Sequence, residues 1–133
     1  MEPTVADREA VLDGLRSYNR GHAPGPAFRE VALFARDGDG RIRGGLLGEI
    51  GWEWLHVQIL WLDEAYRGRG YGSQLLAMAE REAKADGCRN AYLDTLEFQA
   101  LPFYERHGYR VFGVLNDFPP GFRRFFLQKK LDG

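Results

Sequence analysis

The stretch that decides the fold reads LWLDEAYRGRGYGSQLL, residues 60–76. An apolar strand pattern ends near Leu62, glycines alternate with other residues between positions 68 and 72, and a helical pattern follows at once. Alternating glycines at a strand-to-helix turn leave several backbone N–H groups pointing in one direction, and the first N–H groups of a helix carry about half a positive charge. The turn is therefore a predicted site for a phosphate or pyrophosphate.

Side chains around this turn favour the same interpretation. Arg67 and Arg69 supply positive charge, and Ser73 supplies a hydroxyl donor. The P-loop pattern does not match, because its last glycine is followed by Lys and then Ser or Thr, and the dinucleotide pattern GxGxxG does not match because Gly72 stands one position too early. The alternative is a glycine-rich turn that binds nothing, which the coincidence of arginines, glycines and a helix start disfavours.

Hydrophobic periodicity on either side of the turn predicts a mixed fold. Helices are expected over about 7–19, 70–86 and 99–107, and strands over about 28–35, 43–50, 54–62, 90–96, 109–115 and 122–130. Asp7 is the expected N-cap of the first helix. The order of elements predicts one α/β (α+β) domain over residues 1–133. The strands 54–62 and 90–96 should be parallel neighbours, because the helix between them makes a right-handed crossover.

Composition sets limits on function. The 133 residues are 44% hydrophobic and 28% charged, which is typical of an ordinary globular domain. No apolar stretch reaches ~18 residues, so we expect no membrane span. The net charge of −1 argues against nucleic acid as a partner, although basic residues near position 124 leave RNA binding as a weak alternative. The first residues show no secretory signal pattern, so we expect a cytoplasmic protein.

The single cysteine, Cys88, excludes a disulfide within the chain and makes a cysteine-based zinc site implausible. We therefore expect no metal. Cys88 itself is interpreted as a small buried hydrophobic residue, since only Arg89 stands beside it to activate the thiol.

Two segments together resemble a known family. Arg67-Gly68-Arg69-Gly70-Tyr71-Gly72 matches the Arg/Gln-x-x-Gly-x-Gly/Ala signature of the GNAT acyltransferase superfamily, and ALPFYERHGY, residues 100–109, is similar to that family's closing helix. The resemblance is close over residues 54–112 and rests elsewhere on the order of elements. It implies a mixed, mostly antiparallel sheet of six or seven strands flanked by helices, with a splayed parallel strand pair at the cofactor site.

The resemblance also implies acetyl-CoA as cosubstrate, held between the strand that ends at Leu62 and the strand that ends at Leu96. The backbone of residues 60–62 would pair with the pantetheine arm, and the turn would hold the pyrophosphate. An asparagine frequent in the family is replaced here by Glu97, with Gln99 as a nearby substitute. The expected cofactor-binding residues are Leu60, Trp61, Leu62, Arg67, Gly68, Arg69, Gly70, Tyr71, Gly72, Ser73 and Gln99.

Acetyl transfer to an amine needs a neutral amine, so a base must take a proton, and the departing thiolate gains from a donor. The resemblance places Tyr104 as that donor, and core packing is the alternative role for this tyrosine. His56 and Glu53 are the candidate bases, with Glu49 and Asp94 also considered. The alternating strand pattern places His56 and Gln58 on one face, where they form either a site or a satisfied polar network. The base is therefore left open.

The function expected from this resemblance is acetyl transfer from acetyl-CoA to a primary amine by direct attack in a ternary complex. The alternative is a non-catalytic acyl-CoA sensor on the same fold. The acceptor pocket is expected to include Tyr18, Asn19 and the loop 118–122, and its mixture of aromatic and acidic residues favours a cationic amine or a lysine side chain. The partner is thus a small-molecule or peptide amine, and a homodimer is left open.

Overall fold

The computed structural model describes residues 2–131, and its elements follow the predicted order. They are α1 (Val5–His22), β1 (Arg29–Arg36), β2 (Ile42–Gly51), β3 (Trp54–Leu62), the short 3₁₀ helix η1 (Glu64–Tyr66), α2 (Tyr71–Ala85), β4 (Asn90–Leu96), α3 (Leu101–Arg106), β5 (Arg110–Leu115) and β6 (Arg124–Lys130). One detail was wrong: the N-cap of α1 is Thr4, and Asp7 is its capping-box partner inside the helix.

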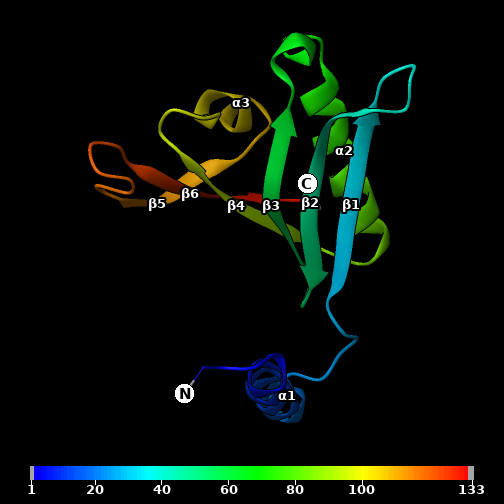
Figure 1. Ribbon diagram of the computed structural model, residues 1–133, viewed down its shortest axis with the longest axis vertical. Helices are drawn as coiled ribbons and strands as arrows, with labels where there is room; N and C mark the ends of the chain where they lie inside the picture. The colour runs from blue at the N-terminus through cyan, green and yellow to red at the C-terminus, as the bar shows by residue number, and fades with distance from the viewer. Residues whose placement is uncertain (1, 132–133) are drawn as a thin grey trace.

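The six strands form one sheet in the order β1-β2-β3-β4-β6-β5 (Figure 1). Every neighbouring pair is antiparallel except β3 and β4, which run parallel, so the predicted mixed sheet and its parallel pair are confirmed. The parallel pairing joins Trp54–Val57 to Asn90–Leu93 and goes no further. Beyond Val57 and Leu93 the two strands separate, which divides the sheet into an arm of β1–β3 and an arm of β4–β6.

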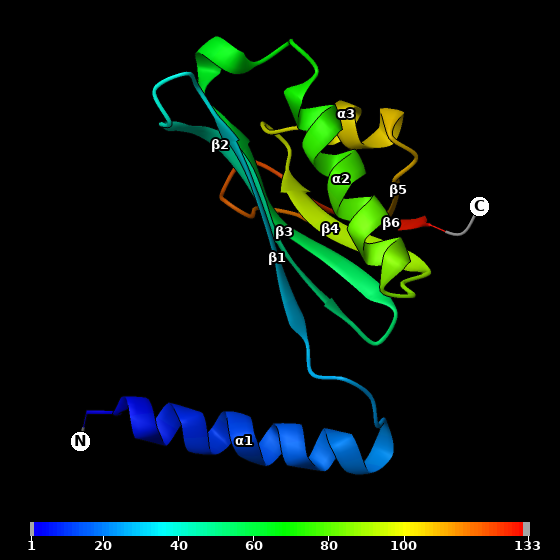
Figure 2. The same ribbon diagram turned by 90° about the vertical axis from the view of Figure 1, so that its right-hand side faces the viewer.

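The helix α2 covers one face of the sheet (Figure 2). Its predicted apolar side is buried, with Leu76, Ala79 and Ala83 almost fully excluded from solvent against Leu46 and Leu55. At about 25 cal/mol per Å² of apolar surface, a buried leucine such as Leu76 contributes about 1.5–3 kcal/mol and each alanine about 0.8 kcal/mol. This helix therefore fixes the position of the turn that precedes it.

A buried polar contact ties α2 to the far arm. The hydroxyl of Tyr109 donates to Glu80 over 2.8 Å, and Lys129 Nζ on β6 donates to the other oxygen of the same carboxylate over 2.8 Å. Burial, followed by the charge of Glu80, raises the pKa of Tyr109, so the phenol stays protonated and keeps donating.

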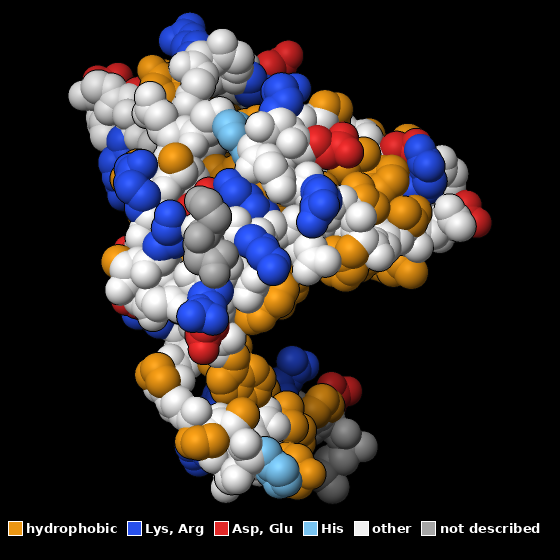
Figure 3. Space-filling model, turned by 180° about the vertical axis from the view of Figure 1, so that it is seen from behind, with side chains coloured by type: hydrophobic (Ala, Val, Ile, Leu, Met, Phe, Trp, Pro, Cys, Tyr) orange, Lys and Arg blue, Asp and Glu red, His pale blue; other side chains and the backbone are white. Residues whose placement is uncertain are grey.

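The first helix is arranged differently. It lies beyond the end of the β1–β3 arm, and none of its residues is buried (Figures 1 and 2). From behind, a deep recess separates α1 from the rest of the molecule, with hydrophobic side chains on both sides of it (Figure 3). Tyr18 and Asn19, expected near an acceptor pocket, lie on this separate helix.

Candidate active site

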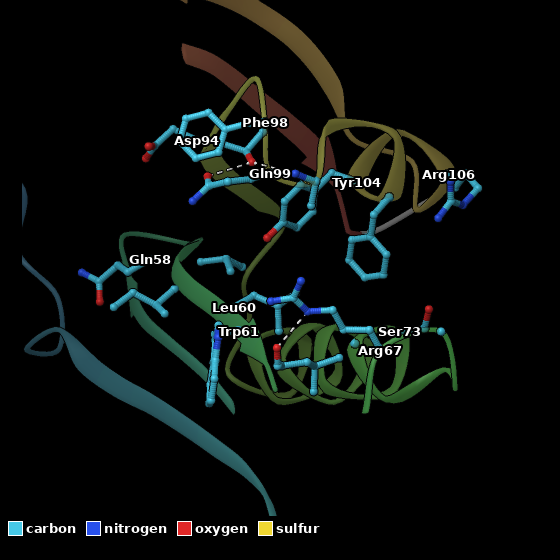
Figure 4. A pocket seen from close by; sticks show the side chains of 18 of the residues that line it. Gln58, Leu60, Trp61, Arg67, Ser73, Asp94, Phe98, Gln99, Tyr104 and Arg106 are labelled. Carbon is cyan, nitrogen blue, oxygen red and sulfur yellow. Dashed lines mark hydrogen bonds between the residues drawn. The ribbon is translucent and has the colours of Figure 1, made fainter. Parts of the chain in front are cut away.

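A cavity of about 920 Å³ opens where β3 and β4 separate. Its lining comes from the second half of β3, the turn before α2, the end of β4 and the helix α3 (Figure 4). The parallel pairing that stops at Val57 and Leu93 creates this space, because each strand continues without its neighbour. The unpaired edge of β3 along residues 59–62 can accept an extended chain as an added strand.

The turn before α2 has the geometry of an anion site. Gly68 and Gly70 have φ angles of +74° and +86°, in the left-handed region that glycine adopts without strain. Gly70 is the N-cap of α2, so the amides of the first helical turn have no partner within the helix. Arg67 Nε donates to the carbonyl of Leu62 over 3.0 Å, which holds this arginine along the cavity wall. The turn fits the pyrophosphate of acetyl-CoA by these features.

The structure brings most of the predicted cofactor residues to the cavity wall, and two of them lie outside it. The lining includes Leu60, Trp61, Leu62, Arg67, Gly68, Gly70, Gly72, Ser73 and Gln99. Arg69 and Tyr71 are not among the lining residues; the guanidinium of Arg69 lies 5.6 Å from the ring centre of Tyr66, and Tyr71 packs against the same ring. These two residues therefore brace the turn from its outer side.

Tyr104 lies on α3 with its hydroxyl directed into the cavity (Figure 4). Its side chain is 6% exposed, and its ring packs edge-on against Phe103 and Tyr109. Burial, followed by the charge of Asp94, raises the pKa of Tyr104 to about 12. The phenol is therefore protonated at neutral pH and can donate a proton or a hydrogen bond. Packing and donation, the two roles considered for this tyrosine, are both compatible with its position.

A β-bulge changes the expected faces of β3. Gly48 pairs with Val57 and Leu47 with Ile59, so Gln58 is an extra residue without a partner on β2. The prediction that His56 and Gln58 share a face with Leu60 by simple alternation is therefore wrong. Gln58 lines the cavity, whereas His56 is not among its lining residues.

His56 is half-buried and stacks on Tyr92, with ring centres 4.2 Å apart and an interplanar angle of 10°. Burial lowers the pKa of His56 despite the opposing charges of Asp94 and Glu49. The imidazole is therefore neutral at pH 7, which is the form that accepts a proton.

Glu53 lies far from the cavity along β3. It occupies the β2–β3 turn with a φ of +67°, and its backbone carbonyl accepts from the amides of Arg89 and Asn90. Its exposed carboxylate lies 3.6 Å from Arg89. The structure therefore gives Glu53 a position at the paired end of the parallel strands and does not bring it to the cavity.

The loop after β4 contains the departure from the family pattern. Glu97 points away from the cavity to Arg123, whose guanidinium lies 3.0 Å from the carboxylate and whose amide donates to it over 2.8 Å. Gln99 instead lines the cavity. Its carbonyl oxygen accepts from the Leu96 amide over 2.8 Å and from the Thr95 hydroxyl over 3.3 Å. This leaves the amide NH₂ group of Gln99 to donate, as a replacement for the missing asparagine would.

Sequence reasoning missed Arg106 as a lining residue and His107 as a neighbour of the predicted residue Ser73. Arg106 lines the cavity one turn after Phe103. His107 follows it, and its Nε2 lies 2.8 Å from the Ser73 hydroxyl. The spacing of Phe103, Arg106 and His107 on one short helix contains this signal, since residues three and four apart face the same way. It could not be used without knowing that α3 lies beside the turn.

A second hollow of about 760 Å³ adjoins the first and shares Gln58, Asp94 and Gln99 with it. Its other wall is the loop of Phe118, Pro119 and Pro120, which the sequence suggested as part of an acceptor pocket. Arg124 Nε donates to Asp94 over 2.7 Å, and its guanidinium lies 4.4 Å from the Phe118 ring centre. The loop is thereby held over the end of the cavity that is remote from the turn.

Within residues 2–131, no group of three or more His, Cys, Asp or Glu side chains is placed to hold a metal ion. None of the described helices is long and apolar enough to cross a membrane. Cys88 is buried, as interpreted from the sequence, and burial raises the pKa of its thiol.

The fold and cavity define an α+β protein with a cavity between two splayed parallel strands and a glycine-rich turn at the start of a helix on the cavity wall. Comparison with known proteins specifies the class. Residues 9–109 match the model of the acetyltransferase (GNAT) family. The chain is 44% identical over 101 residues to blasticidin-S acetyltransferase of Streptomyces morookaense, covering 75% of this chain and 74% of that protein. It is 40% identical to an acetyltransferase of Agrobacterium fabrum over 129 residues, 95% and 94% of the two chains.

A solved structure agrees with this assignment. The crystal structure of an acetyltransferase from Bacillus cereus superimposes with a TM-score of 0.89 at 38% identity, covering 98% of this chain and 95% of that one. The chain belongs to the GNAT acetyltransferase family. It is thus an acetyl-CoA-dependent acetyltransferase, and the predicted family, fold and cosubstrate are confirmed.

Proposed function

We propose that the protein transfers the acetyl group of acetyl-CoA to a primary amine by direct attack in a ternary complex. The observation that carries this proposal is the position of the Tyr104 hydroxyl. It points into the cavity between the unpaired edge of β3 and the anion-binding turn (Figure 4). A phenol with a pKa of about 12 is a donor at neutral pH, and a donor is what a departing thiolate needs.

Acetyl-CoA supplies the activated thioester. Backbone groups of residues 59–62 pair with its pantetheine arm, and the turn from Arg67 to Ser73 holds its pyrophosphate. Gln99 donates its amide to the cosubstrate from the opposite wall. These contacts place the thioester carbonyl near Tyr104 and keep the two reactants in a fixed geometry, which removes the entropic cost of bringing them together.

The nitrogen lone pair of the neutral amine forms the new C–N bond to the acetyl carbon, and the C–S bond breaks with its electron pair on sulfur. Tyr104 donates its proton to that sulfur, and the attacking nitrogen loses one proton. Proton exchange with solvent then reprotonates the Tyr104 phenolate and deprotonates the base, so the enzyme returns to its starting state. His56 is our candidate for the group that finally accepts this proton. It is neutral at pH 7 because of burial, and a water chain must link it to the cavity, which it does not line. Glu53 and Glu49 are not needed in this scheme.

We place the acceptor in the second hollow, between the loop at Phe118 and the shared residues Gln58 and Asp94. Phe118 offers an aromatic face, and Asp94 and Asp117 outnumber the single cation Arg124 in its lining. Such a lining suits a cationic amine better than an anion. The relative named for blasticidin S provides a first compound to test.

Release of free CoA thiol, measured across blasticidin S, polyamines, aminoglycosides, amino acids and lysine peptides, tests the proposal. We expect amine-dependent thiol release with at least one cationic amine. The mass of that amine should increase by one acetyl group, and the acetyl group should be attached to its nitrogen. Acetyl-CoA binding without thiol release for any amine would contradict it. Asp117→Asn removes one negative charge from the lining of the second hollow and keeps the size of the side chain. It should raise KM for the amine and leave acetyl-CoA affinity unchanged.

A further inference from the structure

The helix α1 carries an apolar stripe that no other described part of the chain covers. Val11, Leu12, Leu15 and Tyr18 recur at helical spacing on one side, and they are 73%, 41%, 57% and 65% exposed. In proteins most of the stability of an amphipathic helix such as α1 comes from packing of its apolar side. The capping box at Thr4 contributes about 1 kcal/mol, which does not replace that packing. The stripe therefore needs a partner surface.

A second uncovered apolar surface lies on the face of the β1–β3 arm opposite α2, which we call the open face. Strand register brings its members into two adjacent rows across the three strands, Ala32–Leu47–Ile59 and Phe34–Gly45–Trp61. Phe34, Ile59 and Trp61 are 48%, 54% and 50% exposed. Gly45 lies between Phe34 and Trp61 in its row, and the Phe34 ring covers it, with Cδ1 3.1 Å from where a Cβ on Gly45 would stand.

The segment between α1 and β1, residues 23–28, prevents α1 from lying on the open face of its own chain in this conformation. Trp52 Nε1 donates to the carbonyl of Ala23 over 3.2 Å, and the Trp52 ring packs edge-on against Phe28 with centres 5.0 Å apart. Both contacts hold the segment after α1 against the β2–β3 turn, at the end of the sheet. From there α1 runs across the sheet end and not along its face (Figure 2).

The exposed area of the chain indicates how much surface is unpartnered. The chain exposes 9300 Å², whereas a compact monomer of 15.2 kDa exposes roughly 7,100 Å². The excess is roughly 2,200 Å² per chain, and a standard stable interface buries about 800 Å² on each partner. Two copies that cover each other's stripe and open face therefore have enough surface for a stable dimer.

We propose that the protein is a homodimer in which α1 of each copy lies on the open face of the other. A twofold axis makes such contacts reciprocal, so two different uncovered surfaces on one chain satisfy each other. Charge agrees with this arrangement: within residues 2–131, Arg8 on the stripe side and the cross-strand neighbours Glu30 and Glu49 have no ion-pair partner.

The exchange has a consequence for the active site. Ile59 and Trp61 belong both to the open face and to the cavity lining. The helix of the second copy therefore borders the mouth of the cavity, and residues such as Tyr18 and Asn19 approach the site only from the partner copy. This interface forms whichever amine the enzyme accepts.

Sedimentation of the full chain measures the first part of the proposal. We expect a dimer of about 30 kDa, twice the 15.2 kDa chain, at micromolar concentration. Leu15→Glu should raise the dissociation constant of the dimer at least tenfold and so shift the protein toward monomer. Ser17→Glu, about 200° around the helix, should leave the dimer intact. A monomeric wild-type protein, or a dimer that Leu15→Glu does not weaken, would overturn the proposal.

Cross-linking measures which surfaces meet and does not depend on how the variants affect affinity. In a Cys88→Ala background, a chain with Leu15→Cys and a differently tagged chain with Phe34→Cys are co-expressed and treated with a short bis-maleimide. We expect a cross-link between the two tagged chains, and a much weaker one when Ser17→Cys replaces Leu15→Cys. A chain that carries both Leu15→Cys and Phe34→Cys gives the opposing test. If it forms a cross-link only within itself, α1 folds back on its own sheet and the exchange between copies is refuted.

Discussion

The two halves of the β3–β4 pair differ in what they contribute. Near the start of both strands, Leu55, Val57, Ala91 and Leu93 are at most 2% exposed and the backbones pair directly. Near their ends, the same strands separate, and the cavity lies between them. The paired half therefore supplies stability, and the splayed half supplies a backbone edge and a set of polar side chains. A substitution in one half should affect one property and spare the other.

The largest effect on activity is expected in the splayed half, from Tyr104→Phe. The change keeps the ring that packs on Phe103 and removes the hydroxyl that donates to sulfur. General acid catalysis is worth about 10²–10⁴-fold, or about 3–5 kcal/mol of barrier, so kcat should fall by that factor. Steady-state rates with an active amine, beside calorimetric acetyl-CoA affinity, make the measurement. Wild-type kcat with chemistry rate-limiting would assign Tyr104 to packing alone.

In the paired half, Leu55→Ala should act on stability. Leu55 is fully buried against α2, and such truncations cost about 2–5 kcal/mol. Urea unfolding should show this loss, while acetyl-CoA affinity of the folded variant stays within a few-fold of wild type. A large loss of affinity in folded Leu55→Ala would mean that the two halves are not separable.

The pH dependence of stability gives a smaller effect at the junction of the two halves. Burial lowers the pKa of His56 in the folded state, so the unfolded chain binds more protons just below pH 6.5. This group's contribution is therefore complete above about pH 6.5 and is lost as the pH falls through the folded pKa. His56→Phe keeps the stacking on Tyr92 and removes the titration. Unfolding midpoints at pH 7.5 and 5.5 should differ less for the variant than for wild type.

Much of the splayed half could be predicted from the sequence, because its signals are local. The glycines at 68–72, the helix that follows them and the strand pattern before them specify the turn without reference to the rest of the chain. The parallel pairing of β3 and β4 could also be predicted, because the helix between them makes a crossover connection and such connections are right-handed. The predicted residues Arg67, Gly70, Ser73 and Tyr104 accordingly lie on the cavity wall.

What could not be predicted depends on contacts between distant segments. The bulge that separates Gln58 from His56 arises from the register of β3 against β2, which alternation within β3 does not contain. The contact of Ser73 with His107 depends on how α3 approaches the turn. The exposure of α1 could not be predicted either, because an amphipathic pattern reports an apolar side and not what covers it.

The most direct test of the central claim compares two glycines at opposite ends of α2. Gly70 and Gly87 have φ angles of +86° and +88°, and a Cβ on either meets nothing within 4 Å, so valine strains both backbones alike. Only Gly70 lines the cavity. Calorimetry with acetyl-CoA should show a loss of at least tenfold in affinity for Gly70→Val and a change within a few-fold for Gly87→Val. Equal affinity of the two folded variants would contradict the assignment of this turn as the pyrophosphate site.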